Sequence, residues 1–161
     1  MVSYREATPA DLPSLCELGG EVNAIHHAAW PHIFAAPGSP ERDREHWLQG
    51  VGGDSASTFV AEDGGLIIGF VSVSVVTETH SLLQPLRYAR VRSVAVDANH
   101  RGRGLGSALM ALAEQWAVHH GAKEMRLSVW AFNERAMSMY AELGYEMRSH
   151  VLGKRLGGDD A

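Results

Sequence analysis

The chain contains one cysteine and no long apolar segment, and both scarcities exclude whole classes of protein. A single thiol, Cys16, forms no disulfide within the chain and builds no multi-cysteine zinc site. The longest apolar stretch, residues 66–76, is interrupted by glycine and serine and is shorter than the roughly 20 residues that span a bilayer. The N-terminus has no apolar signal core, so we expect a cytoplasmic protein with no membrane partner.

Basic residues are also few. Lysine and arginine number 14 against 19 aspartates and glutamates, which gives a net charge of −5 with histidine neutral. Because phosphate contacts dominate nucleic-acid affinity, we expect no nucleic-acid partner, and the mildly acidic balance favours cationic small molecules. A length of 161 residues favours one domain, which we place at 1–156, with a glycine-rich acidic tail at 157–161 that we expect to be disordered.

Apolar periodicity predicts about four helices and six to seven strands. Strands are expected at 2–7, 57–63, 66–76, 87–96 and 125–130, with one or two more between 145 and 156. Helices are expected from Thr8 past Val22, from Ser39 to about Gly50, after the glycine-rich segment to Gly121, and from Asn133 to Gly144, with a loop from His26 to Pro37. Short turns make consecutive strands antiparallel, whereas the later β-α-β unit is parallel. The order β-α-α-β-β-β-α-β-α-β(β) thus predicts an α/β (α+β) fold with a mixed, mostly antiparallel sheet flanked by helices.

A glycine-rich loop, Arg101-Gly102-Arg103-Gly104-Leu105-Gly106, lies between a predicted strand and a predicted amphipathic helix. Its glycines let the backbone approach a ligand closely. The helix presents unpaired N–H groups and the positive end of its dipole, and two arginines add permanent positive charge. Together these features indicate an anion site that suits a diphosphate.

The spacing of the loop disfavours two common nucleotide motifs. A P-loop requires Gly-Lys-Ser/Thr, whereas Gly106 is followed directly by Ser107. The dinucleotide pattern Gly-x-Gly-x-x-Gly is not met either, because the glycines stand at 102, 104 and 106. The alternative is a plain glycine-rich turn with two solvated arginines.

The segment Arg101-x-x-Gly104-x-Gly106 resembles the Gln/Arg-x-x-Gly-x-Gly/Ala signature of the GNAT N-acetyltransferase superfamily. The preceding Val94-Ala95-Val96-Asp97 looks like that family's fourth strand. Downstream, Asn133-x-x-Ala136-x-x-x-Tyr140-x-x-x-Gly144-Tyr145 looks like its second cofactor motif. The predicted element order is similar to the family's order over nearly the whole chain.

The resemblance implies acetyl-CoA as the cofactor, CoA as the product and no metal. It places the pantetheine arm along the fourth strand, which a bulge separates from the strand near Ser128, and the pyrophosphate in the glycine loop. Asn133 would lie beside the acetyl end, and Tyr140 would be the general acid that protonates the departing thiolate. Core packing is the alternative for Tyr140, because Met137 and Ala141 share its helix face. The cofactor-binding residues implied are Val94, Ala95, Val96, Arg101, Gly102, Arg103, Gly104, Leu105, Gly106, Ser107, Asn133 and Tyr140.

A base for the acceptor amine is harder to assign. Some family members have a glutamate on the fourth strand, but the alternating residues Arg90, Arg92 and Val94 offer no carboxylate there. Glu78 and His80, in the loop before that strand, are candidates, and so is a water chain to bulk solvent.

A segment rich in histidine and aromatic residues, from His26 to Phe34, follows the first helix. It has no ordered metal-ligand spacing, so we expect no metal there. In the family this region often lines the acceptor pocket, and an aromatic wall suits an amine through cation–π contact. Packing of Trp30 and Phe34 over the sheet edge is the alternative. The predicted substrate-binding residues are His26, Trp30, Phe34 and Ser128.

The residues and the resemblance together favour an N-acetyltransferase that moves acetyl from acetyl-CoA to a primary amine of a small molecule by direct attack in a ternary complex. Two alternatives stay open: acetylation of protein lysines or N-termini, and a non-catalytic acyl-CoA-binding regulatory module. The resemblance also implies a homodimer.

Overall fold

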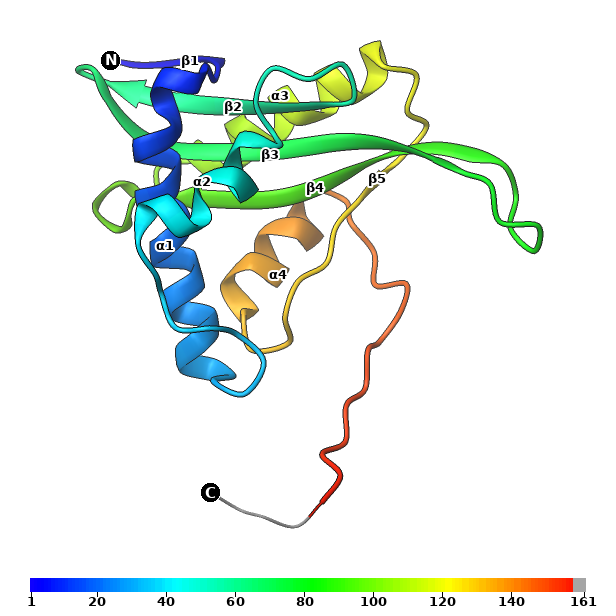
Figure 1. The fold of residues 1–161 in the computed structure, drawn as a ribbon. Helices are drawn as coiled ribbons and strands as arrows, with labels where there is room; N and C mark the ends of the chain where they lie inside the picture. The colour runs from blue at the N-terminus through cyan, green and yellow to red at the C-terminus, as the bar shows by residue number, and fades with distance from the viewer. Residues whose placement is uncertain (158–161) are drawn as a thin grey trace.

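In residues 1–157, which the computed structural model describes, five strands form one sheet in the order β1-β2-β3-β4-β5, flanked by four α-helices (Figure 1). Neighbouring strands are antiparallel except β4 and β5, which confirms the mixed, mostly antiparallel α/β fold. The strands are β1 (Val2–Glu6), β2 (Ala56–Asp63), β3 (Leu66–Glu78), β4 (Leu86–Val96) and β5 (Met125–Arg126). The helices are α1 (Leu12–Ala29), α2 (Pro40–Leu48), α3 (Leu105–His119) and α4 (Glu134–Glu142).

The C-terminal part of the strand prediction is wrong in extent. The strand expected at 125–130 is limited to Met125–Arg126, and no strand forms between residues 145 and 157. That last segment is extended and leads away from the sheet (Figure 1), with Val151 and Leu152 97% and 92% exposed. An extended segment becomes a strand only when a neighbouring strand takes up its backbone hydrogen bonds. The rest of the tail predicted to be disordered, 158–161, lies outside the described residues.

The first helix is longer than expected. The predicted loop begins at His26, but α1 continues to Ala29, which places His26 and His27 in its last turn. Ala28 and Ala29 are strong helix formers, and the chain meets its next proline only at Pro31.

Helices cover both faces of the sheet (Figure 1). On one face, Leu12 and Leu15 of α1 pack with Phe70 of β3 in a buried cluster. On the other face, Leu109 and Met110 of α3 pack in a second cluster with residues of β2, β3 and β4. The two clusters hold the central strands β3 and β4 rigidly between the helices.

Strand β4 carries a bulge before the glycine loop. Ser72 pairs with Ser93 and Val73 with Val91, so Arg92 is the extra residue on β4. Pairing of β4 with β5 covers only two positions, Ala89 with Met125 and Arg90 with Arg126. The strands β4 and β5 therefore separate next to the bulge.

Helices α1 and α2 approach each other at Gly19. A Cβ atom at Gly19 would overlap the indole of Trp47, which also packs edge-on against Phe70 at 5.3 Å between ring centroids. The neighbouring Gly20 faces open space. Only Gly19 is therefore required for the close approach of the two helices.

Gly19→Ala is expected to lower the free energy of unfolding by about 1–3 kcal/mol, because the added methyl group overpacks the contact with Trp47. Gly20→Ala is the matched control and should raise stability by about 0.5–1 kcal/mol, since alanine is favoured over glycine in a helix. Urea unfolding of the three proteins measures both effects. Equal stability of the two variants would contradict the packing.

An ion-pair network joins β1 to the start of α1. Arg5 donates to both carboxylate oxygens of Asp11, at 2.8 and 2.9 Å, and Asp11 also accepts the backbone N–H of Thr8 at 2.8 Å. The hydrogen bonds from Arg5 hold the pKa of Asp11 at about 2. The carboxylate is thus more stable as an anion in the folded chain than in the unfolded one.

Because the folded pKa of Asp11 lies below its unfolded value of about 3.8, its contribution to stability is complete above pH 4 and disappears as the pH falls towards 2. The shift corresponds to about 2 kcal/mol. We expect Asp11→Asn to be less stable than the wild type at pH 6 and the difference to shrink towards pH 2. Urea unfolding of both proteins across this range measures it, and a difference independent of pH would contradict the assignment.

Candidate active site

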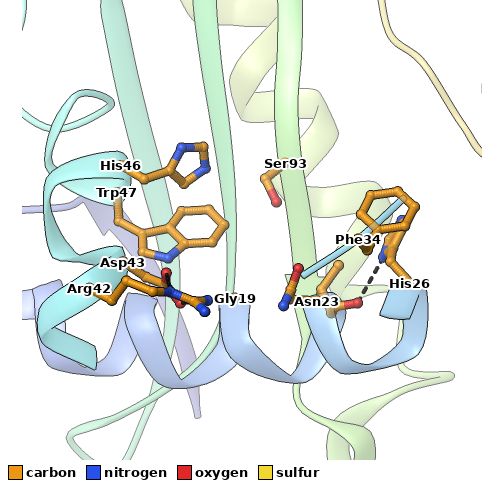
Figure 2. A pocket seen from close by; sticks show the side chains of 10 residues that line it. Gly19, Asn23, His26, Phe34, Arg42, Asp43, His46, Trp47 and Ser93 are labelled. Carbon is orange, nitrogen blue, oxygen red and sulfur yellow. Dashed lines mark hydrogen bonds and ion pairs between the residues drawn. The ribbon is translucent and has the colours of Figure 1, made fainter. Parts of the chain in front are cut away.

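Two cavities adjoin in the structure and share three lining residues, Val22, His26 and Ser93. The strand cavity, about 190 Å³, lies where β4 and the chain after β5 separate. The helix cavity, about 260 Å³, lies between α1, α2 and β4 (Figure 2). The strand cavity is lined by Val22, His26, Val91, Arg92, Ser93, Val94, Leu127, Ser128, Val129, Trp130, Asn133, Ala136, Met139 and Tyr140.

The strand cavity unites predicted site residues that are far apart in the sequence. Val94 of β4, Ser128 after β5, and Asn133 and Tyr140 of the α4 region all line it, and so does His26 of α1. The wall formed by β4 begins at the bulge, where the strand loses its parallel partner. Backbone groups of β4 that β5 does not reach are free to pair with another extended chain.

Tyr140 projects from α4 into the strand cavity. Burial raises the pKa of its phenol above the ordinary value of 10, so the hydroxyl stays protonated throughout the neutral range. Its ring lies edge-on to that of Tyr145 at 5.7 Å between centroids. The same helix position thus serves packing and presents a proton donor.

Asn133 begins α4, as predicted. Its Oδ1 accepts the backbone N–H of Ala136 at 3.2 Å, a helix-capping hydrogen bond. Because the cap uses the amide oxygen, the amide NH₂ remains available as a donor on the side chain that lines the strand cavity.

The segment between α1 and α2 forms part of the helix cavity. Side chains of both helices donate hydrogen bonds to backbone carbonyl groups of this segment. Asn23 donates to the carbonyl of Ala35 at 3.1 Å, and Arg42 donates to the carbonyl of Ala36 at 3.0 Å. Arg42 also donates twice to the carboxylate of Asp43, at 2.7 and 3.0 Å. The residues of α2 were not predicted as part of the site, because the sequence indicates only a helix from Ser39 to about Gly50.

Val22, His26 and Ser93 line both cavities, so the two meet at these side chains. The Nδ1 atom of His26 lies 2.7 Å from the carbonyl of Val22 (Figure 2). The His26 ring also contacts Phe34 edge-on at 4.9 Å and Phe132 at 5.4 Å between centroids. The imidazole is therefore fixed at the junction.

The glycine loop follows β4 and leads into α3. Gly102 and Gly104 have φ values of +76° and +77°, and a side chain at either would point into open space. Arg101 donates to the carbonyl of Val96 at 3.0 Å, which ties the loop back to β4. Gly106 differs from the other two, because a Cβ there would lie 3.0 Å from the Sδ atom of Met139. Its role in this structure is to let α3 and α4 approach.

Among the residues predicted as a base or as part of the acceptor pocket, three lie away from the cavities. Glu78 ends β3, and His80 follows it in the connection to β4, where the backbone N–H of His80 donates to the Glu78 carboxylate at 2.9 Å. Neither lines the strand cavity or the helix cavity. Trp30 caps the end of α1, is 41% exposed and also lines neither, whereas Phe34 lines the helix cavity.

The fold and the site together define a class of protein. Residues 21–145 match the acetyltransferase (GNAT) family, and the chain belongs to it. No helix in the described residues has the length and apolar character to cross a membrane. The same residues contain no cluster of three or more histidine, cysteine, aspartate or glutamate side chains suited to a metal ion.

Named relatives include several acetyltransferases. The chain is 32% identical over 100 residues to an uncharacterized N-acetyltransferase, MJ1207, of Methanocaldococcus jannaschii, covering 62% of this chain and 43% of that protein. It is 25% identical over 138 residues to an aminoglycoside N(6')-acetyltransferase type 1 of Salmonella enteritidis, covering 82% and 93%. The chain spans less than half the length of the first curated relatives it matches.

Solved structures share the fold. A mutant of the BH1408 protein from Bacillus halodurans superimposes with a TM-score of 0.86 at 23% identity, over 96% of this chain and 99% of that one. The aminoglycoside acetyltransferase AAC(6')-Iy in complex with a bisubstrate analog has a TM-score of 0.70 at 21% identity, over 98% and 99%.

Proposed function

We propose that the protein is an acetyl-CoA-dependent N-acetyltransferase that acetylates a primary amine of a small molecule by direct attack in a ternary complex. The observation that carries the proposal is the strand cavity, which joins Tyr140 and Asn133 to the stretch of β4 that β5 leaves unpaired. Acetyl-CoA supplies a thioester whose acetyl group an amine can accept.

The residues present fit a CoA molecule. The open sides of Gly102 and Gly104, the N-terminus of α3, and Arg101 and Arg103 suit the pyrophosphate. The backbone of Val94, Ala95 and Val96 suits the amide groups of the pantetheine arm, because an extended chain can take the place of a paired strand there. The cofactor set that we propose is Val94, Ala95, Val96, Arg101, Gly102, Arg103, Gly104, Leu105, Gly106, Ser107, Asn133 and Tyr140.

Tyr140 is the proposed general acid. A thiolate leaving group gains from a donor aimed at its sulfur, and the raised pKa of Tyr140 keeps that donor protonated. Asn133 would orient the acetyl end through its amide NH₂ group.

The helix cavity is the proposed acceptor site. Its aromatic side chains Phe34 and Trp47 suit an ammonium group, and its volume of about 260 Å³ suits a small molecule. The Salmonella enteritidis relative and AAC(6')-Iy are named for aminoglycosides, which are small-molecule amines. The carboxylate of Asp43 is held by Arg42, so it is less available to a polycation than an unpaired acid would be.

A homodimer is a further proposal. Its support is the extended C-terminal segment, whose apolar side chains Met147, Val151, Leu152 and Leu156 are all exposed. Burial of these side chains against a second copy of the chain would remove their apolar surface from water.

Tyr140→Phe is expected to lower kcat about 10²-fold or more, because the thiolate loses its proton donor, while the Kd for acetyl-CoA changes little. Thiol release from acetyl-CoA with kanamycin, spermidine and a peptide with a free N-terminus measures kcat, and calorimetry measures Kd. Tyr145→Phe is the control, since its hydroxyl is buried without a hydrogen-bond partner among the described residues and the tyrosine lies outside the cavity. This variant should keep full activity.

Each alternative has its own outcome in the same assay. Tight acetyl-CoA binding without thiol release from any acceptor would contradict an enzyme and favour a binding module. Release with the peptide alone would favour protein acetylation. An unchanged kcat in Tyr140→Phe would contradict the role of the phenol.

A further inference from the structure

The junction of the two cavities holds a titratable side chain whose chemistry is not used by the proposed function. His26 lines the strand cavity together with Tyr140 and lines the helix cavity together with Asp43 and His46. A group at this junction lies between the proposed site of the thioester and the proposed site of the amine. The reacting nitrogen has to pass this point to reach the acetyl carbon.

The hydrogen bond of His26 selects its tautomer. Nδ1 lies 2.7 Å from the carbonyl oxygen of Val22, and a carbonyl only accepts, so Nδ1 carries the hydrogen. In the neutral ring the lone pair then belongs to Nε2. Edge-on contacts with Phe34 and Phe132 hold the ring plane in place. His26 thus presents a proton acceptor in a fixed direction.

The other titratable or charged groups around the two cavities are less suited to accept a proton. The hydrogen bonds from Arg42 lower the pKa of Asp43, which makes its carboxylate a weaker base. His46 lines the helix cavity alone, with its ring against Trp47 at 4.6 Å. Arg92, on the wall of the strand cavity, has no lone pair to offer.

We infer that His26 is the general base that deprotonates the acceptor amine, an inference that rests on the proposed function. The amine nitrogen bonds to the acetyl carbonyl carbon as the carbon–sulfur bond breaks. Nε2 of His26 takes a proton from the acceptor's ammonium group before the attack and releases it to solvent, and it takes the second nitrogen proton as the amide forms, while the hydroxyl proton of Tyr140 passes to the sulfur. Solvent then removes the proton from His26 and restores that of Tyr140, so the products are the amide and the free thiol.

Two variants test the base. Both replace the imidazole with an amide, which takes up no proton at neutral pH: the amide of His26→Asn lies near the position of Nδ1, and that of His26→Gln near the position of Nε2. Both are expected to lower kcat/KM about 10²-fold or more at neutral pH, with the loss shrinking at alkaline pH, where the amine loses its proton to solvent. The acceptor for this experiment is the one with the highest turnover among kanamycin, spermidine and the peptide with a free N-terminus.

His27→Gln is the matched control. The Nδ1 atom of His27 also lies 2.7 Å from a backbone carbonyl, that of Phe34, but His27 lines neither cavity. Its replacement disturbs the same turn of α1 without reaching the proposed chemistry. We expect full kcat/KM and an unchanged pH profile.

Nitrogen-15 NMR of the uniformly labelled protein gives a readout that is independent of turnover. The neutral ring of His26 should show a protonated Nδ1 and a bare Nε2, and its signals should be lost in His26→Asn. A neutral ring protonated at Nε2 would overturn the inference.

The outcomes separate the inference from the function on which it rests. A wild-type protein that transfers acetyl to no acceptor in the panel would overturn both. Turnover with the pH profile of His26→Asn unchanged would overturn the base alone. Equal losses in His26→Asn and His27→Gln would show a structural effect of the helix end and would also overturn the base.

Discussion

The candidate site depends on the early end of the pairing between β4 and β5. Two residue pairs join these strands, and beyond Arg90 the backbone of β4 has no strand on that side. The bulge at Arg92 lies close to this point of β4. The strand cavity opens there, where continued pairing with β5 would have closed the gap. Unpaired peptide groups are costly to bury without partners, so this edge favours a ligand that carries amides of its own.

Around this opening, the groups of the proposed chemistry come from three elements of the structure. β4 contributes backbone groups, α4 contributes Tyr140 and Asn133, and α1 contributes His26 from the turn at which the helix ends. Because α1 packs on the sheet through Leu12 and Leu15, the position of its last turn is set by the core. The packing of α1 on the central strands therefore fixes the position of His26 in the site.

Much of the fold could be predicted from the sequence, because local signals are strong there. Thr8-Pro9 and Ser39-Pro40 mark two helix starts, and Gly64-Gly65 marks the hairpin between β2 and β3. The prediction of strands at 145–156 was wrong, because a strand forms only beside a second strand, and the local sequence pattern does not show whether one is present. The length of α1 was underestimated because histidines and a tryptophan suggested a loop, although Ala28 and Ala29 favour helix.

The parts of the candidate site that could be predicted from the sequence are those formed by short motifs of neighbouring residues. The glycine loop and the segment from Asn133 to Tyr140 carry recognisable spacing, and the second of these borders the strand cavity. The contributions of Asn23, Asp43 and Trp47 had no such signal, since an isolated polar or aromatic residue on a helix predicts nothing about its partners. They line the helix cavity because α1 and α2 pack against each other, and this tertiary contact is not visible in the local sequence.

The separation of the two cavities bears on how such a protein changes over evolutionary time. The walls that belong to the helix cavity alone come from residues 19–47, whereas those particular to the strand cavity come from residues 91–140. Substitutions in the first region can therefore reshape the helix cavity, the proposed acceptor site, while the second region keeps its geometry. Only Val22, His26 and Ser93 belong to both cavities. Under the proposed function, the range of acceptors and the transfer chemistry can therefore change almost independently, because the two cavities share only one turn of α1 and a single residue of β4.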